Sequence, residues 1–138
     1  MPSAVPSKRN PAYPFDIKRS VVHLLHRAEQ CTADTFSTRL AHRDLTPRQF
    51  AVLVAVAVRE SATQTTITED TGIDRSTMVD VVRRLMKRGL LQRRRSRLDA
   101  RSYIVRLTDL GRNIADAALP EATEVDQAIL SALSVDER

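Results

Sequence analysis

Residues 72–108 read GIDRSTMVDVVRRLMKRGLLQRRRSRLDARSYIVRLT, and this stretch predicts a helix followed by a basic β-hairpin. Asp74 is a side-chain cap for a helix that runs to about residue 88, and Gly89 ends it because glycine tolerates the left-handed conformation common at helix ends. Apolar side chains at i, i+3, i+4 and i+7 predict one buried face, formed by Met78, Val81, Val82 and Leu85. The opposite face carries Ser76, Asp80, Arg83 and Lys87.

Two short strands are predicted beyond this helix. Residues 90–97 begin with a strand-like pattern, and side chains alternate through residues 103–107 with the period of a strand that has one buried face. Tyr103, Val105 and Leu107 form the side expected to point inward. A short polar loop, residues 96–100, joins the strands and predicts a β-hairpin with a basic tip. Its first strand and loop carry Arg93, Arg94, Arg95 and Arg97.

Two further helices are predicted on the N-terminal side of this stretch. Thr46 and Gln49 form a capping box, with a proline at the first helical position between them. The expected core-facing stripe of that helix is Phe50, Leu53, Val54 and Ala57. Thr63 caps a short helix that Gly72 stops. Two helices separated by a turn at Gly72, the second of them basic, match the helix-turn-helix plan.

The two ends of the chain predict different structures. Prolines at positions 2, 6, 11 and 14 predict an extended, poorly ordered arm over residues 1–15. From Asp16 a helix carries a heptad-like seam of Ile17, Val21, Leu24, Ala28, Cys31 and Thr35. This helix is expected to contact its own domain and a second copy, the alternative being core burial alone, and its seam position predicts that Cys31 is buried. Thr108 caps a C-terminal helix in which Pro120 is expected to cause a kink or a division.

Composition narrows the class of protein. The 138 residues suit one domain, and their net charge of +5 is unevenly distributed. Residues 74–106 contain 11 Lys and Arg against 3 Asp and Glu, whereas residues 109–138 contain 2 against 7. A positive segment of this kind indicates a nucleic-acid partner, the alternative being a solvated basic face. No apolar run approaches the roughly 20 residues of a membrane span, and the start has no signal-peptide pattern, so we expect a cytoplasmic protein with no membrane partner.

The sequence lacks the residue patterns of disulfide-bonded, metal-binding and catalytic sites. A single cysteine, Cys31, gives no internal disulfide and no zinc-type spacing. His23 and His26 lie one turn apart with Cys31 or His42 as an undetermined third ligand, so a metal sensor is one alternative, and a peroxide-sensing thiol at Cys31 is another. No Ser/His/Asp order, Gly-rich phosphate loop or paired-carboxylate site stands out. We therefore expect no enzymatic activity, no metal site and no cofactor.

In their order and spacing these pieces resemble the MarR family of winged helix-turn-helix repressors. The matching segments are Leu45–Phe50, Gly72–Val79, Arg84–Leu85, Arg88–Leu91, Asp99–Arg101 and Val105–Gly111. The resemblance spans about residues 17–138 and implies a mainly α fold with a small β-hairpin wing, dimerised by its N- and C-terminal helices. It divides the chain into a flexible arm (1–15), an N-terminal dimerisation helix (16–44), a DNA-binding lobe (45–108) and a C-terminal dimerisation region (109–138). Residues 134–138 look like the opening turn of the family's last helix. This favours a truncated piece, the alternative being a protein that dimerises with less surface.

The resemblance also implies roles for individual residues. A homodimer would place two recognition helices, residues 74–88, in successive major grooves of a pseudo-palindromic operator. Asp99 is expected to fix the wing loop, and Arg101 to reach a minor groove whose negative potential attracts arginine. Asp80 accepts from a cytosine amine or, as we favour, pairs with Arg83 or Arg84. The implied DNA-binding residues are Arg75, Ser76, Thr77, Asp80, Arg83, Arg84, Lys87, Arg93, Arg94, Arg95, Arg97, Asp99 and Arg101.

A small effector is the last expectation. Members of the family commonly bind small anionic or aromatic molecules in a cleft between the dimerisation helices and the DNA-binding lobe. The implied ligand residues are His23, His26 and Arg27, with Arg27 pairing with a carboxylate. The alternative is that these three side chains simply face solvent. The sequence therefore predicts a repressor released by a small ligand, and the competing interpretation is an architectural DNA-binding protein without a ligand or a preferred sequence.

Overall fold

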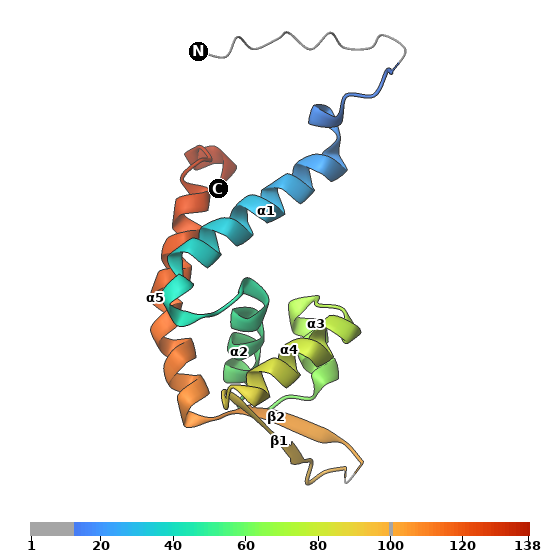
Figure 1. The fold of residues 1–138 in the computed structure, drawn as a ribbon, viewed down its shortest axis with the longest axis vertical. Helices are drawn as coiled ribbons and strands as arrows, with labels where there is room; N and C mark the ends of the chain where they lie inside the picture. Colours follow the sequence, from blue (N-terminus) through green and yellow to red (C-terminus); the bar gives the residue numbers. More distant parts are fainter. Residues whose placement is uncertain (1–12, 100) are drawn as a thin grey trace. The chain divides into compact units, whose positions relative to one another are not determined.

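The computed structural model describes residues 13–99 and 101–138, and the chain divides into two compact units, residues 1–31 and 32–138. Most of the predicted arm, residues 1–12, lies outside the described residues, as does Ala100 of the predicted hairpin loop. Within the described residues, five α-helices and one antiparallel hairpin make up the main regular structure, which is the predicted class (Figure 1). The elements are α1 (Val21–Arg39), α2 (Pro47–Arg59), α3 (Gln64–Thr71), α4 (Arg75–Lys87), β1 (Leu91–Arg95), β2 (Tyr103–Leu107) and α5 (Asp109–Leu130), with short 3₁₀ turns at Ile17–Arg19, Ala41–Arg43 and Val135–Glu137.

Side-chain caps begin four of these helices where the sequence predicts them. In the capping box of α2, the hydroxyl of Thr46 accepts from the backbone N–H of Gln49 at 3.2 Å, and Gln49 Oε1 accepts from the N–H of Thr46 at 3.1 Å. Thr63, Asp74 and Thr108 cap α3, α4 and α5 in the same way. These bonds satisfy N–H groups that have no partner within the helix, so helix starts could be located from local sequence.

The first long helix begins later than predicted. Asp16 caps only a 3₁₀ turn, because Ser20 adopts an extended conformation with a ψ of 120°. The hydroxyl of Ser20 then accepts from the N–H of His23 at 3.4 Å, and α1 starts at Val21. A polar side chain that bonds to nearby backbone in this way competes with helix continuation. The predicted burial of Cys31 is wrong for the single chain, in which this side chain is exposed, as are Val21 and Leu24 of the same seam.

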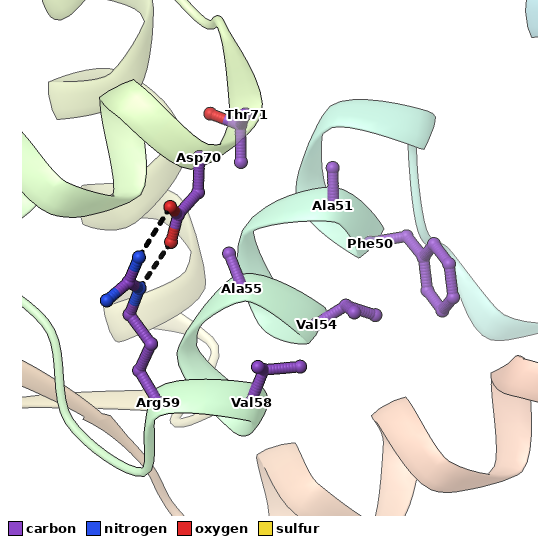
Figure 2. A pocket seen from close by; sticks show the side chains of 8 residues that line it. All are labelled: Phe50, Ala51, Val54, Ala55, Val58, Arg59, Asp70 and Thr71. Atoms are coloured by element: carbon purple, nitrogen blue, oxygen red, sulfur yellow. Dashed lines mark hydrogen bonds and ion pairs between the residues drawn. The ribbon is translucent and has the colours of Figure 1, made fainter.

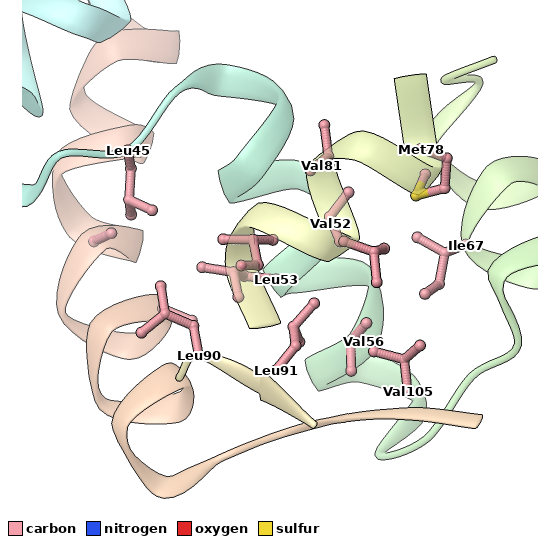
Figure 3. Close-up of a cluster of buried hydrophobic side chains, with 14 of the residues drawn as sticks. Leu45, Val52, Leu53, Val56, Ile67, Met78, Val81, Leu90, Leu91 and Val105 are labelled. Atoms are coloured by element: carbon pink, nitrogen blue, oxygen red, sulfur yellow. The ribbon is translucent and has the colours of Figure 1, made fainter. Parts of the chain in front are cut away.

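The core of residues 32–138 lies where α2, α3, α4, α5 and the hairpin meet (Figure 3). The predicted buried face of α4 is confirmed, since Met78, Val81, Val82 and Leu85 are all buried. The predicted stripe of α2 is wrong in part. Val52, Leu53 and Val56 are its buried side chains, whereas Phe50, Val54 and Ala57 are only half-buried. Because α2 is apolar on nearly every side, its periodicity could not show which face is covered.

The hairpin pairs Leu91 with Leu107 at its base and Arg95 with Tyr103 near its tip. A third strand-like segment, absent from the sequence prediction, adds to it. The N–H of Ala62 donates to the carbonyl of Val105 at 3.0 Å, and the N–H of Val105 donates back at 2.7 Å. A single paired residue has no alternating pattern, so sequence periodicity could not reveal it.

The base of the hairpin is closed against the start of α5. The N–H of Thr108 donates to the carbonyl of Leu90 at 3.1 Å, and the hydroxyl of Thr108 donates to the carbonyl of Gly89 at 2.5 Å. Gly111 packs so tightly here that a Cβ on it would overlap the carbonyl group of Leu90. The two ends of the hairpin and the first turn of α5 therefore form one junction.

Pro120 does not divide the C-terminal helix, contrary to one of the two expected outcomes. The helix α5 is continuous from Asp109 to Leu130 with Pro120 inside it. Both Pro120 and Asp116 are exposed, so the carbonyl that loses its N–H donor lies on the solvent side of the helix. Within residues 13–99 and 101–138, no helix has the length and apolar character needed to cross a membrane.

Candidate nucleic-acid interface

The N-terminus of α4 presents polar groups around a single carboxylate. Asp74 Oδ1 accepts from the N–H of Thr77 at 2.9 Å and from the hydroxyl of Ser76 at 2.7 Å. Hydrogen bonds from Thr77 and Ser76 hold the pKa of Asp74 well below its usual range. Arg75 and Ser76 are exposed, and Thr77 is half-buried. The structure thus brings together the three residues predicted to lie closest to DNA, with Asp74 fixing their backbone.

The outward face of α4 carries an ion-pair cluster. Asp80 Oδ1 accepts from Arg83 Nη2 at 2.5 Å, and Asp80 Oδ2 accepts from Arg84 Nε at 2.7 Å. The bonds from Arg83 and Arg84 lower the pKa of Asp80 below its ordinary value. The favoured sequence interpretation, pairing of Asp80 with a neighbouring arginine, is therefore confirmed for both candidates. Lys87 is exposed on the same helix.

On the hairpin, Tyr103 organises two of the predicted arginines. The guanidinium of Arg93 lies 3.9 Å from the centre of the Tyr103 ring, and that of Arg95 lies 5.9 Å from it. The expectation that Tyr103 points into the core is wrong, because its side chain is 39% exposed. It lies toward the tip of the hairpin, beyond buried Val105, where arginine side chains cover its ring instead of the core. The strand pattern placed Tyr103 on the correct face but could not show how far the core extends.

A turn at the tip of the hairpin is held by its own side chains. Asp99 Oδ1 accepts from the N–H of Arg101 at 2.9 Å, and the carbonyl of Asp99 accepts from the N–H of Ser102 at 3.0 Å. Ser96 Oγ accepts from the N–H groups of Leu98 and Asp99 at 3.2 and 3.3 Å. The side chain of Arg101 extends from this turn and is exposed.

Some of the predicted basic residues are already paired within the protein and others are not. Arg83, Arg84, Arg93 and Arg95 contact Asp80 or Tyr103 as described above. Among the described residues, the other basic side chains predicted to bind DNA make no hydrogen bond or ion pair. These are Arg75, Lys87, Arg94, Arg97 and Arg101, all exposed. Their donors are therefore available to phosphates or to base edges.

The predicted ligand residues lie on α1. His23 is half-buried, whereas His26 and Arg27 are exposed. Their spacing of three and four residues puts the three side chains on one face of that helix. All three belong to the unit of residues 1–31.

Sequence reasoning missed a groove over the outer face of α2 beside α3; in Figure 2, Asp70 and Thr71 of α3 lie at one edge of it, and Phe50 and Val54 of α2 lie on the other side. Its volume is about 790 Å³, and its lining residues are Phe50, Ala51, Val54, Ala55, Val58, Arg59, Asp70 and Thr71. Arg59 Nε donates to Asp70 Oδ2 at 2.5 Å and Arg59 Nη2 to Asp70 Oδ1 at 2.7 Å, and the pKa of Asp70 falls below its usual value because of this pairing. The groove thus combines an apolar wall from α2 with a cation held in place by α3. Its sequence signal was a second apolar series on α2, at positions 51, 54, 55 and 58.

Comparisons with known proteins agree with this arrangement. A family model described as the MarR family matches residues 43–102. The HTH-type transcriptional repressor NicR of Pseudomonas putida is 31% identical over 137 residues, which covers 99% of this chain and 85% of NicR.

Two solved structures extend the likeness to three dimensions. BpsR of Bordetella bronchiseptica, whose DNA binding is regulated by 6-hydroxynicotinic acid, is 31% identical with a TM-score of 0.84, and the match covers 91% of this chain and 90% of BpsR. The PcaV transcriptional regulator of Streptomyces coelicolor, in complex with its natural ligand, is 33% identical with a TM-score of 0.84, and the match covers 91% of this chain and 88% of PcaV.

Proposed function

Because this chain belongs to the MarR family of DNA-binding transcriptional regulators, we propose that it represses transcription by binding a pseudo-palindromic operator as a homodimer, and that a small ligand releases it. The observation that carries the DNA-binding part is the concentration of exposed basic side chains on α4 and the hairpin. Among the basic side chains predicted to bind DNA, five have no hydrogen-bond, ion-pair or aromatic-ring partner within the described part of the chain: Arg75, Lys87, Arg94, Arg97 and Arg101. Basic groups arranged in this way match the charge of a DNA backbone.

In this proposal, the parts of the surface have different tasks. Arg75, Ser76 and Thr77 at the start of α4 contact base edges, as the first residues of a recognition helix do. The hairpin arginines, Arg93, Arg94, Arg95 and Arg97, bind phosphates, which fix position and affinity without carrying sequence information. Arg101, on the turn that Asp99 holds, enters the minor groove. Arg83, Arg84 and Lys87 serve the backbone beside the recognition helix.

The proposed effector is an aromatic acid. BpsR responds to such a compound, and it is 31% identical to this chain. Two candidate sites on this chain have groups that could bind an aromatic acid. One is the α1 set of His23, His26 and Arg27. The other is the groove over α2 beside α3, where the aromatic ring would lie on the apolar surface of α2 and the carboxylate would reach Arg59. Arginine binds a carboxylate through two parallel hydrogen bonds, and apolar walls with a few polar groups are typical of ligand sites.

Operator recognition is tested by selecting sequences from a random duplex library and measuring their affinities by fluorescence anisotropy. A regulator should prefer the selected pseudo-palindrome to random duplex by about a thousandfold or more. An architectural protein would bind both about equally, and that result would overturn the proposed function.

Effector control is tested by calorimetry and operator release with benzoate, 6-hydroxynicotinate and aromatic coenzyme A esters. Arg27→Ala and Arg59→Ala separate the two candidate sites, and Arg48→Ala removes an exposed arginine of α2 that is outside both. Loss of release in one variant identifies its site. Release that persists in both variants would reject both sites, and an absence of binding to the wild type would reject ligand control by these acids.

A further inference from the structure

One carboxylate on the DNA-facing side of α4 has no structural task there. Residues 74–106 contain three acids. Asp74 accepts from the N–H of Thr77 and caps α4, and Asp99 accepts from the N–H of Arg101 and fixes the hairpin turn. Asp80 accepts from arginine side chains, and from no backbone N–H of the described residues. It therefore adds negative charge to a DNA-binding surface without supporting the backbone.

The two arginines bound to Asp80 are held weakly. Their side chains are 76% and 67% exposed for Arg83 and Arg84, and that of Asp80 is 38% exposed. Ion pairs as open as these, three and four residues apart on a helix, contribute little to stability because water and salt screen them. DNA phosphates can therefore compete with Asp80 for both guanidinium groups.

That competition leaves Asp80 in an unfavourable position. Once Arg83 and Arg84 donate to phosphates, the carboxylate faces a polyanion with no cation beside it, which weakens binding to any DNA. A donor on a base edge relieves this cost. Cytosine offers one in the major groove, since its N4 amine donates to a carboxylate. Asp80 lies one turn from Ser76 on the same helix face, so it shares the side of α4 that is proposed to face the bases.

We propose that Asp80 sets the sequence specificity of this regulator by withholding Arg83 and Arg84 from DNA that lacks a cytosine opposite it. This inference rests on the proposed function, because it requires α4 to be the recognition helix. On a wrong sequence, Asp80 keeps both arginines and repels the phosphates. On the right sequence, the cytosine amine binds Asp80 and the two arginines move to the backbone. Specificity then comes from weaker binding to wrong sites as well as from stronger binding to the right one.

Asp80→Asn tests this proposal, because it keeps the side-chain size and removes the charge. The matched control is Asp116→Asn, which changes the net charge equally at an exposed position of α5. We expect Asp80→Asn to bind random duplex about tenfold more tightly than the wild type, with a plot of log affinity against log salt that is steeper by about two units, one for each released arginine. Asp116→Asn should match the wild type. Equal affinity and slope in the two variants would overturn the proposal.

Sequence selection gives an independent readout. The wild type should enrich a cytosine at one position of each half-site, and Asp80→Asn should lose that enrichment while keeping the rest of the selected sequence. An unchanged cytosine preference in Asp80→Asn would also overturn the proposal. Failure of the proposed function is distinguishable, because the wild type would then select no sequence at all, whereas failure of this inference alone leaves a selected operator and an unaltered specificity ratio.

Discussion

At the scale of residues, Arg94 differs from its neighbours in what surrounds it. Arg93 and Arg95 share the face of the hairpin with Tyr103, whereas Arg94 lies on the opposite face and is exposed. Its guanidinium is therefore the one among these three without a contact to the Tyr103 ring. Arg93 and Arg95 are therefore positioned by a contact within the protein. Arg94 has no such contact and is available to a phosphate.

Arg94→Ala should weaken binding to all DNA sequences about equally and reduce the salt slope by about one unit, because it removes one phosphate contact. Ser76→Ala should instead change which sequence is preferred. Both are measured by anisotropy on operator and random duplex, with Arg48→Ala, an exposed arginine outside the basic segment, as the control. A changed sequence preference with an unaltered salt slope in Arg94→Ala would contradict the assignment of Arg94 to phosphate.

Asp74 links the start of α4 to pH. Its pKa is lowered in the folded chain, so its stabilising effect is complete above the pKa of an unfolded aspartate, about 3.9, and is lost as the pH falls through the folded value. Asp74→Asn keeps a good helix cap but cannot titrate. We expect the midpoint of thermal unfolding to fall less steeply below about pH 4 in this variant than in the wild type. Asp126→Asn, at an exposed position of α5, is the control. If the unfolding midpoints of wild type and Asp74→Asn fell equally steeply below about pH 4, the contribution of Asp74 to acid sensitivity would be refuted.

At the scale of elements, the junction between the hairpin and α5 requires a residue without a side chain. Gly111→Ala would gain helix propensity, but its Cβ would overlap the backbone of Leu90, which cannot move as a side-chain tip can. We expect a loss of about 3 kcal/mol in the free energy of unfolding, at the upper end for overpacking. At Gly72 nothing lies within 4 Å and the strain comes from a φ of +68°, so Gly72→Ala should lose only about 1–2 kcal/mol. Urea titration measures both, and equal losses would contradict the close approach.

The elements that sequence predicted well are those with local signals. Thr46 with Gln49, Thr63 and Asp74 each bond within three residues, so the helix starts follow from the chain alone. The contacts that sequence missed join distant residues, such as Ala62 with Val105 and Arg59 with Asp70. Nothing in the spacing of such pairs identifies them before the chain folds.

The candidate site shows the same division. The basic face of α4 and the hairpin arginines followed from periodicity and charge, and the pairing of Asp80 followed from helix spacing. The exposure of Tyr103 did not follow, because it depends on where the core ends. The groove beside Arg59 did not follow either, because α3 contributes two of its three polar lining residues, Asp70 and Thr71.

At the scale of the whole molecule, the first and last helices expose apolar side chains that a single copy leaves in water. Val21, Leu24 and Leu25 of α1 are 70%, 46% and 66% exposed, and Leu119 and Leu130 of α5 are 44% and 43% exposed. Large apolar side chains left in water on each helix are typical of surfaces that pack against another protein. A second copy is the partner that the proposed two-fold operator requires.

We therefore expect the chain to sediment as a dimer and to protect two half-sites about 10 base pairs apart. Leu24→Asp combined with Leu25→Asp should yield monomers and reduce operator affinity by about 100-fold or more, because each copy then binds its half-site alone. Gln30→Asp adds a charge at an exposed position of the same helix and should leave the dimer intact. A monomeric wild type that bound a half-site with full operator affinity would rule out dimeric recognition.

The closed base of the hairpin has a consequence for how such proteins diversify. Thr108 joins the two ends of the hairpin through the carbonyls of Gly89 and Leu90, so the segment between them begins and ends at one point. Insertions or deletions at the tip, around residues 96–101, change the length of the hairpin without moving the helices on either side. Over evolutionary time the tip is then free to lengthen, shorten or exchange arginines while α4 is inherited unchanged. Two lineages that share one recognition helix can in this way come to differ in how far along the DNA each one reaches.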